Sequence, residues 1–163
     1  MTERELGLKQ GSKAPDFDLP TETGEMIRLS SLYGGKPILV YFYPSDFGVM
    51  CSVVMKAFRE IYSELKDHCL FVPISCNTTY SHGAWSDSLR LPFFLLSDVD
   101  CSVTKAYDLY GDDNGFLGDR SYRACFMLDK NGIVRYAWAP NDPALEPDYD
   151  LLIELAERLD REG

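Results

Sequence analysis

Residues 41–52, YFYPSDFGVMCS, end an apolar run at Pro44 and place a cysteine, Cys51, seven residues further along. The thiolate of a cysteine is a nucleophile and is the form that reacts with oxidants. Free cysteine is also among the residue types most often buried as a small apolar side chain. Both interpretations of Cys51 are open at this point, and the elements around it must decide between them.

Three polar residues close to Cys51 could hydrogen-bond its sulfur: Ser45, Asp46 and Ser52. Pro44 fixes its φ angle and ends the apolar run, so the loop that follows is free to fold back over the sulfur. A carboxylate close to the sulfur would oppose formation of the thiolate, because like charges repel. We therefore expect the Asp46 side chain to point away from Cys51.

The elements on either side of this loop can be predicted from their hydrophobic periods. The run 37–43 is continuously apolar, which is typical of a strand buried on both faces. Cys51 is then predicted to lie in the first turn of the following helix, where unpaired N–H groups and the helix dipole favour an anion. The helix is indicated by apolar residues at three- and four-residue spacing: Val54, Ala57, Phe58, Ile61 and Leu65.

Strand and helix patterns continue to alternate along the chain. We predict a strand at 69–75, a helix at 81–89, a strand or extended segment at 92–98, and a short helix over 101–111 that Gly111 ends. Asn131-Gly132, between the apolar runs 123–129 and 133–138, predicts a β-hairpin. A C-terminal helix begins near Pro147 and Asp148, with an apolar face made of Leu151, Leu152, Leu155, Ala156 and Leu159.

This order of elements predicts an α/β fold. The order β-α-β followed by β-β-α is that of a thioredoxin-like fold, with a central mixed β-sheet flanked by helices, a closing β-hairpin and a C-terminal helix. No segment has the composition of a linker, so residues 1–163 are predicted to form one domain.

Charge and cysteine content exclude several classes of partner. A net charge of −10 disfavours nucleic acid and anionic membrane surfaces, and no apolar run is long enough to span a bilayer. The N-terminus shows no secretory signal, and the five cysteines include no C-x-x-C pair and no zinc-type spacing. We expect a cytoplasmic protein with free thiols, no metal and no organic cofactor.

The segment 13–47, KAPDFDLPTETGEMIRLSSLYGGKPILVYFYPSDF, resembles the opening of peroxiredoxins of the alkyl hydroperoxide reductase and thiol-specific antioxidant group. ISCNTTYSHGAW (74–85) and LLSDVDCSVTKAYDLYG (95–111) are similar to later stretches of the same family. The resemblance runs from about Gly11 to Trp138. It implies a thiol peroxidase that reduces hydrogen peroxide or small organic hydroperoxides.

The family's site, P-x-x-x-T/S-x-x-C with a distant arginine, maps onto four residues of this chain. The resemblance implies that Cys51 attacks the peroxide and becomes a sulfenic acid, which a thiol then reduces. It implies that Arg123 stabilises the thiolate and polarises the peroxide, while Pro44 and position 48 line the substrate site. Arg120 is three residues from Arg123, but Arg123 fits the register of the strand that ends in Asp129.

Two positions depart from the family pattern. Gly48 stands where the family has Thr or Ser, so a hydroxyl that would contact both the peroxide and the sulfur is missing. A hydrogen bond to a charged group contributes about 1.5–3 kcal/mol, equivalent to about ten- to a hundredfold in rate if it forms fully only in the transition state. Val54 stands where the family has a Glu that belongs to a polar network near the arginine.

A two-cysteine mechanism requires a resolving thiol, and the family's usual positions for it hold Lys56 and Trp85 here. A one-cysteine mechanism with an external thiol or thioredoxin-like reductant is therefore expected. Among the other cysteines, Cys101 begins a predicted helix and is expected to be exposed, which makes it the remaining candidate for a resolving thiol. We expect the others to be core thiols: Cys69, Cys76 and Cys125.

Other residues with reactive or metal-binding side chains are interpreted as structural. The family keeps a Ser-His pair at a helix start, so Ser81 is expected to cap that helix and His82 to lie away from the sulfur. The loop 111–119 is acidic but lacks the closing Glu of a calcium site. Three aromatic residues are expected in the core or on a dimer surface rather than in the substrate pocket: Trp85, Phe93 and Phe94.

Two functions from different classes follow. The pair Cys51 and Arg123 predicts a peroxidase, whereas Gly48 and the altered sequence after Cys51 favour a redox sensor or binding protein with weak peroxidase activity. A thioredoxin-type disulfide reductase is disfavoured because C-x-x-C is missing. The resemblance also implies a homodimer.

Overall fold

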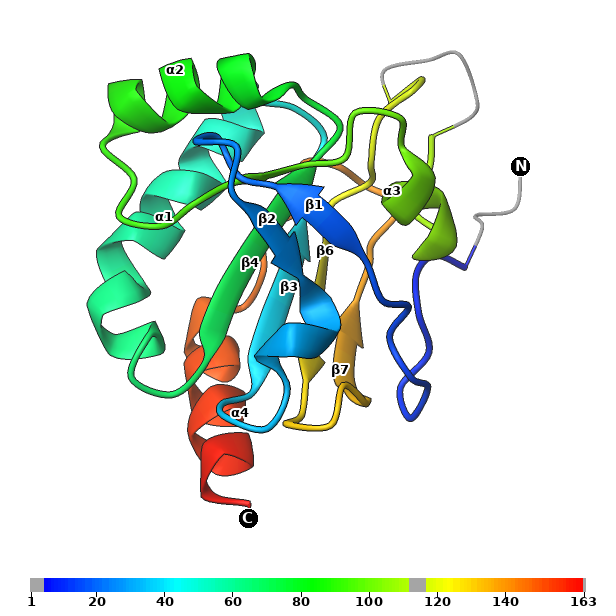
Figure 1. The fold of residues 1–163 in the computed structure, drawn as a ribbon, viewed down its shortest axis with the longest axis vertical. Coiled ribbons are helices and arrows are strands. Elements are labelled where there is room, and N and C mark those ends of the chain that lie inside the picture. Colours follow the sequence, from blue (N-terminus) through cyan, green and yellow to red (C-terminus); the bar gives the residue numbers. More distant parts are fainter. Residues whose placement is uncertain (1–4, 112–116, 163) are drawn as a thin grey trace.

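The computed structural model describes residues 5–111 and 117–162. Its centre is a five-stranded mixed sheet in the order β5-β4-β3-β6-β7 (Figure 1). The innermost strand, β3, pairs in parallel with β4 and antiparallel with β6. The strands of this sheet are β3 (Ile38–Phe42), β4 (Leu70–Ser75), β5 (Leu96–Ser97), β6 (Ala124–Leu128) and β7 (Val134–Trp138).

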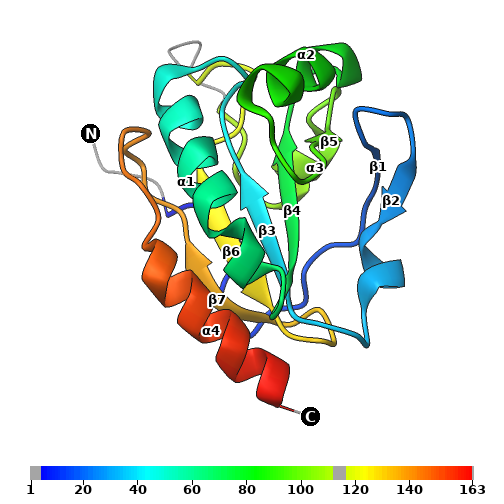
Figure 2. The same cartoon turned by 90° about the vertical axis from the view of Figure 1, so that its left-hand side faces the viewer.

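Helices and a small second sheet cover the two faces of the central sheet. Figure 2 shows α1 and α4 on one face, with the β1-β2 ribbon on the other. The predicted mixed α/β architecture is therefore confirmed. The covering elements are β1 (Asp18–Pro20), β2 (Met26–Arg28), the 3-10 helix η1 (Leu29–Leu32), α1 (Val49–Leu65), α2 (Thr79–Leu89), α3 (Ser102–Ala106) and α4 (Tyr149–Arg161).

Successive side chains of β3 point to opposite faces of the sheet, and the core is therefore divided into two layers. Leu39 and Tyr41 pack with α1, α2 and α4, while Ile38 and Val40 pack with β1, η1 and α3. All the residues of β3 are fully buried, as predicted for a strand covered on both faces. The same packing places Trp85 and Phe93 in the first layer as core residues, while Phe94 packs against the second.

The candidate site lies where β3 ends. Parallel strands β3 and β4 end at the same edge of the sheet, so the loops that follow them lie side by side. The loop after β3 leads into α1, which begins at Val49 and places Cys51 in its first turn, as predicted. The predicted hairpin is also confirmed: β6 and β7 pair across a turn in which Gly132 has φ 82°.

Three element boundaries were predicted wrongly. The helix predicted over 101–111 ends at Ala106, because Asp108 adopts φ 56° and the chain then pairs as a β-bridge between Tyr110 and Ser121. Gly111 therefore ends no helix. Of the strand or extended segment predicted over 92–98, only β5 is a strand, and it pairs with β4 at only two positions.

The third boundary that was predicted wrongly is the start of α2. Thr78, not Ser81, is its N-cap, and the Thr78 hydroxyl accepts a hydrogen bond from the backbone N–H of Ser81. At the C-terminal helix, Asp148 is the N-cap of α4, close to where the sequence predicts its start. Within the described residues, no helix is both long and apolar enough to cross a membrane.

Candidate active site

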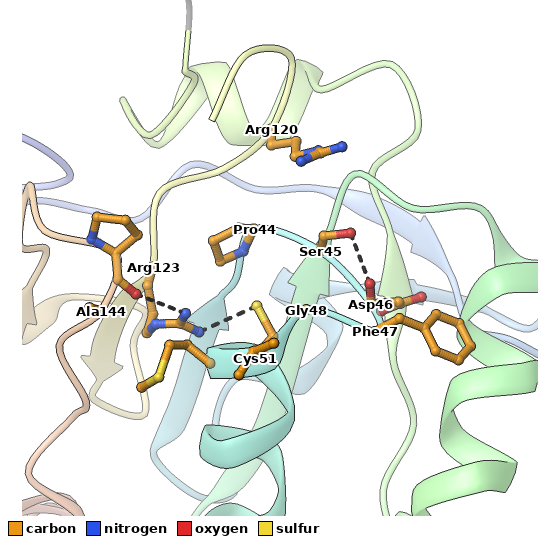
Figure 3. A pocket seen from close by; sticks show the side chains of 12 residues that line it. Pro44, Ser45, Asp46, Phe47, Gly48, Cys51, Arg120, Arg123 and Ala144 are labelled. Carbon is orange, nitrogen blue, oxygen red and sulfur yellow. Dashed lines mark hydrogen bonds between the residues drawn. The ribbon is translucent and has the colours of Figure 1, made fainter. Parts of the chain in front are cut away.

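Cys51 and Arg123 meet at the C-terminal end of β3 (Figure 3). Nη1 of Arg123 lies 3.6 Å from the Cys51 sulfur and donates a second hydrogen bond, of 2.8 Å, to the Tyr41 hydroxyl. Nη2 donates to the carbonyl oxygen of Pro143 at 3.1 Å. Both Cys51 and Arg123 are buried. The guanidinium is thus held from three sides with one edge on the sulfur.

Sheet register explains why these two residues meet. In the antiparallel pair of β3 and β6, Phe42 lies opposite Ala124, so Arg123 enters β6 beside the point where β3 ends. Tyr41 shares the α1 side of β3, which puts its hydroxyl under the first turn of α1. Arg123 precedes β6 and Cys51 follows β3. The two residues therefore lie next to each other because β3 and β6 are neighbouring strands.

The charge of Arg123 is secured by its neighbours. Burial alone would lower the pKa of the Arg123 guanidinium, but the adjacent Tyr41 and Cys51 groups outweigh it and raise that pKa above its ordinary value. Burial raises the pKa of Tyr41 well above that of a free phenol, although Arg123 opposes the shift. Arg123 is therefore a permanent cation, and the Tyr41 hydroxyl stays neutral.

Asp46 is turned away from the sulfur, as predicted, and is buried in a hydrogen-bond network. Its carboxylate accepts from the hydroxyls of Tyr43 at 2.8 Å and Ser81 at 2.9 Å, and it lies 2.6 Å from Nδ1 of His82. Its backbone N–H donates to the side-chain oxygen of Asn77 at 3.0 Å. The loop before α1 is thereby fixed to α2 and to the end of β4.

His82 lies in this network rather than beside Cys51. Its Nε2 is 2.9 Å from the carbonyl oxygen of Leu96, which can only accept, so Nε2 carries a hydrogen. Its Nδ1 faces the Asp46 carboxyl, so one proton must lie between these two groups. Neither side chain is exposed to solvent. His82 is therefore a structural histidine that joins the loop before α1 to the segment at β5.

A pocket of about 510 Å³ opens over the sulfur. All four residues of the sequence-predicted site border it, and so does Arg120. Arg123 rather than Arg120 makes the contact with the sulfur. The lining residues are Pro44, Ser45, Asp46, Phe47, Gly48, Val49, Met50, Cys51, Arg120, Arg123, Pro143 and Ala144.

Gly48 is the N-cap of α1, where no side chain is present to accept from the first turn. Its φ of −66° and ψ of 148° suit any residue, so the backbone does not demand glycine. A Cβ at this position would lie 3.4 Å from the Cys51 sulfur and 3.3 Å from the Ser45 carbonyl oxygen. The family hydroxyl is thus missing from a place where the chain conformation could hold one.

The second position that departs from the family pattern, Val54, belongs to the core. Val54 is fully buried in the core layer of α1, so an apolar contact replaces the family's Glu. The Ser45 hydroxyl donates to the backbone oxygen of Asp46 at 2.9 Å, so it does not replace the missing hydroxyl. No described contact brings the Ser52 hydroxyl to the sulfur.

The structure corrects the expectation for Cys101. We expected it to be exposed, but it is only 8% exposed, and its sulfur lies 2.9 Å from that of Cys76. Its described contacts include none with Cys51. Cys69 and Cys125 are core thiols as predicted, whereas Cys76 is half-buried. Of the acidic loop, Asp112 and Asp113 lie outside the described residues.

Sequence reasoning missed Tyr41 and the carbonyl of Pro143 as partners of Arg123. Tyr41 has a sequence signal: in a strand that ends at Pro44, it lies on the same side as Leu39, facing the helix. The Pro143 carbonyl has no sequence signal, because every residue type supplies a backbone carbonyl. The partners of Asp46 were also missed, although its expected direction was correct.

The chain matches the model of the AhpC/TSA family over residues 10–137, and it belongs to that family. It is an oxidoreductase of the peroxiredoxin type, a thiol peroxidase. It is 35% identical to a Coxiella burnetii protein described as a candidate peroxiredoxin, bcp, over 82% of this chain and 89% of the relative. It is 37% identical to the chloroplastic peroxiredoxin Q of Sedum lineare, over 80% of this chain and 69% of that one.

A further relative is the chloroplastic peroxiredoxin Q of Oryza sativa subsp. japonica, which is 36% identical over 80% of this chain. The match spans 59% of that plant protein's length.

Solved structures confirm the thioredoxin-like fold. The reduced 2-Cys peroxiredoxin of Plasmodium vivax superposes with a TM-score of 0.80 at 26% identity, covering 91% of this chain and 80% of that one. The peroxiredoxin-like protein of Aquifex aeolicus gives a TM-score of 0.84 at 22% identity, and the match covers 95% of this chain and 90% of that one. Peroxidoxin BcpB of Mycobacterium tuberculosis superposes with a TM-score of 0.77 at 24% sequence identity, and the match covers 96% of this chain and 97% of that one.

Proposed function

We propose that this protein reduces hydrogen peroxide or a small organic hydroperoxide at Cys51 by a one-cysteine mechanism. The observation that carries the proposal is the 3.6 Å contact between Nη1 of Arg123 and the Cys51 sulfur at the floor of the pocket. A fixed cation favours negative charge on the sulfur and on the peroxide oxygens. Pro44 borders the pocket, and its proposed role is to shield the sulfur from water.

The reaction has two stages. The Cys51 thiolate attacks one peroxide oxygen, the O–O bond breaks, and the other oxygen leaves as water or an alcohol after taking up a proton. The proton comes from solvent, because Arg123 keeps its own protons and stabilises the departing oxygen through its positive charge. The resulting Cys51 sulfenic acid is then reduced by two equivalents of an external thiol, which leave as a disulfide and water.

An external reductant is proposed because the nearby alternatives are unsuitable. The family's resolving positions hold Lys56 on α1 and the buried Trp85. Cys101 makes its sulfur contact with Cys76 instead. A small thiol or a thioredoxin-like protein is therefore the proposed electron donor, and hydroperoxide is the proposed substrate.

A redox sensor or binding protein with weak peroxidase activity is the second candidate. The observation that favours it is Gly48, which leaves the N-cap of α1 without a hydroxyl, at a position whose Cβ would lie 3.4 Å from the sulfur. The two candidates differ in turnover. When dithiothreitol or reduced thioredoxin is supplied, a peroxidase consumes many equivalents of hydrogen peroxide rapidly, and Cys51→Ser abolishes this rapid turnover. A sensor turns over no faster than a free thiol.

We also propose a homodimer that forms through the start of α1 and α2. Large apolar side chains are exposed there: Phe47 at 60%, Val49 at 82% and Tyr80 at 88%. The Phe47 ring packs 6.2 Å from that of Trp85, so these two elements form one surface. Exposed apolar patches are typical of protein interfaces. Analytical ultracentrifugation of the wild type and of Val49→Glu tests the proposal, since the charge should shift the equilibrium to monomer.

The cytoplasm is the proposed location. The support is chemical: all five cysteines are free thiols, and a reducing compartment keeps them so.

A further inference from the structure

A second pair of thiols lies outside the pocket. The sulfurs of Cys76 and Cys101 are 2.9 Å apart, and both cysteines are free. Cys76 directly follows β4, and Cys101 directly precedes α3, so two separate segments bring them together. The S–S bond of a disulfide is about 2.05 Å long. The two sulfurs therefore need only a short approach to become bonded.

The backbone at Cys101 is held in an uncommon conformation. Its φ of 61° and ψ of 15° lie in the left-handed region, which side chains other than Asn and Asp rarely adopt. Hydrogen bonds fix it there: the Cys101 N–H donates to the Asp98 carbonyl, and its own carbonyl accepts from Lys105, both at 2.9 Å. Conformations of this kind concentrate at functional sites. Here the conformation directs the sulfur at Cys76.

Cys76 is oriented from its other side by a buried hydrogen-bond chain. Its sulfur lies 3.4 Å from the Thr104 hydroxyl, which donates its hydrogen to the buried Asp98 carboxylate at 2.7 Å. Because that hydrogen is already used, the Thr104 oxygen must accept from the S–H of Cys76. Burial, followed by the contact with Cys101, raises the pKa of Cys76, so it remains a neutral thiol and reacts slowly.

The thiol pair lies at the same edge of the sheet as the pocket. Asn77, the residue after Cys76, accepts a hydrogen bond from the backbone N–H of Asp46, which borders the pocket. The Cys101 sulfur lies 3.8 Å from the carbonyl oxygen of Asp119, and the next residue, Arg120, also borders the pocket. The two thiols are therefore flanked by the same segments that surround Cys51.

We propose that Cys76 and Cys101 form a second redox site, a dithiol that a hydroperoxide converts into an intramolecular disulfide. The Cys76 thiol first gives up its proton to solvent, and its thiolate attacks one peroxide oxygen. The O–O bond breaks, Cys76 becomes a sulfenic acid, and the departing oxygen takes up a proton and leaves as water or an alcohol. The Cys101 sulfur then attacks the Cys76 sulfur, and the hydroxyl group leaves as water with the Cys101 proton. Two electrons pass from the thiols to the peroxide, and an external dithiol reverses the change.

The experiment uses the full chain with Cys51→Ser, so that the proposed peroxidase reaction makes no contribution. The protein is treated with excess hydrogen peroxide, quenched with an alkylating agent at increasing times, and digested with trypsin without reduction. Cleavage after Lys66, Arg90 and Lys105 places Cys76 on fragment 67–90 and Cys101 on fragment 91–105. Mass spectrometry should find these two fragments joined, more slowly than Cys51 is oxidised in the wild type, and separated again by dithiothreitol.

Cys69 provides a matched control, because it is a buried thiol on the same fragment as Cys76. In the Cys51→Ser background, Cys76→Ser and Cys101→Ser should each abolish the joined pair, and Cys69→Ser should leave it intact. Failure to find the joined fragments in folded Cys51→Ser protein, or a bond assigned to Cys69 by fragmentation, overturns the proposal. Failure of the wild type to oxidise Cys51 rapidly, with the joined fragments still formed in Cys51→Ser, contradicts only the function proposed for Cys51.

Discussion

The guanidinium of Arg123 and the sulfur of Cys51 lie 3.6 Å apart although 72 residues separate them in sequence. The guanidinium cannot easily move, because the Tyr41 hydroxyl and the Pro143 carbonyl hold it on two other sides. A donor fixed in this way needs no rearrangement when negative charge develops on the sulfur or on a peroxide oxygen.

Arg123→Lys should slow oxidation of Cys51 by hydrogen peroxide. Lysine keeps the charge but lacks the planar fork that contacts the sulfur, Tyr41 and Pro143 together. The loss of one hydrogen bond to a charged group, about 1.5–3 kcal/mol, corresponds to a fall of about ten- to a hundredfold in the second-order rate constant. Stopped-flow fluorescence measures this rate.

Arg120→Lys is the matched control, because Arg120 borders the same pocket without the described contact to the sulfur. Its effect should be clearly smaller than that of Arg123→Lys. Equal effects of the two changes would show that the pocket needs positive charge in general and not the Arg123 contact.

Gly48→Thr should accelerate the reaction. Its Cβ would lie 3.4 Å from the Cys51 sulfur, so the new hydroxyl can reach both the sulfur and a bound peroxide. One added hydrogen bond of this kind should raise the rate by up to about tenfold. As an N-cap, Thr should also stabilise α1 by a few tenths of a kcal/mol relative to Gly.

Gly48→Ala separates the hydroxyl from the added Cβ. Alanine meets the same neighbours, including the Ser45 carbonyl oxygen at 3.3 Å, but supplies no hydrogen bond. A rate increase in Gly48→Ala equal to that in Gly48→Thr would contradict the hydrogen-bond explanation.

His82→Leu should destabilise the protein strongly. It removes the partner of the Asp46 carboxyl from a site where both side chains are fully buried and only 2.6 Å apart. Breaking a buried pair of this type costs about 3–5 kcal/mol. Urea denaturation measures the change in the free energy of unfolding. Ser81→Ala, which removes one hydroxyl from the same carboxylate, should cost only about 1 kcal/mol; similar losses for both would argue against a buried pair.

Cys69 should resist alkylation in the native protein. Burial raises the pKa of the Cys69 thiol to about 12. At pH 8 only about one Cys69 side chain in ten thousand is then a thiolate, the form that iodoacetamide modifies. Mass spectrometry should find Cys51 labelled and Cys69 unlabelled at pH 8, with both labelled in urea. Native labelling of Cys69 as fast as that of Cys51 would refute this assignment.

The same shift has a consequence for stability. The unfolded Cys69 thiol loses its proton above about pH 8.5, whereas the folded one retains it until about pH 12. The folded state therefore binds more protons in this interval, and the free energy of unfolding should fall as the pH rises through it. Cys69→Ala should reduce the slope of stability against pH in urea titrations, relative to the wild type.

The fold and the meeting of Cys51 with Arg123 could be predicted because they depend on periodic patterns and on a long family resemblance. The continuous apolar run at 37–43 specifies β3, and the change of period after it specifies α1. The position of Arg123 beside Cys51 then follows from which strands are neighbours. The periodic patterns do not say which strands are neighbours, so the prediction for Arg123 rested on the family resemblance.

The details that were missed depend on tertiary contacts. The end of α3 at Ala106 is set by the β-bridge between Tyr110 and Ser121, which no local pattern reveals. Cys101 is buried, and its sulfur contacts that of Cys76, 25 residues away in sequence. Capping by Thr78 rather than Ser81 leaves the Ser81 hydroxyl for Asp46, an outcome decided by the loop packed against α2.

The most direct test of the central claim is the oxidation of reduced wild-type protein by hydrogen peroxide in a stopped-flow instrument, with dimedone trapping and mass spectrometry of the fragment that contains Cys51. Fast oxidation, with dimedone on Cys51 and loss of the fast phase in Cys51→Ser, is the predicted result. A rate no greater than that of a free thiol such as cysteine, or dimedone on another cysteine, would contradict the claim that Cys51 is the peroxide-reactive thiol.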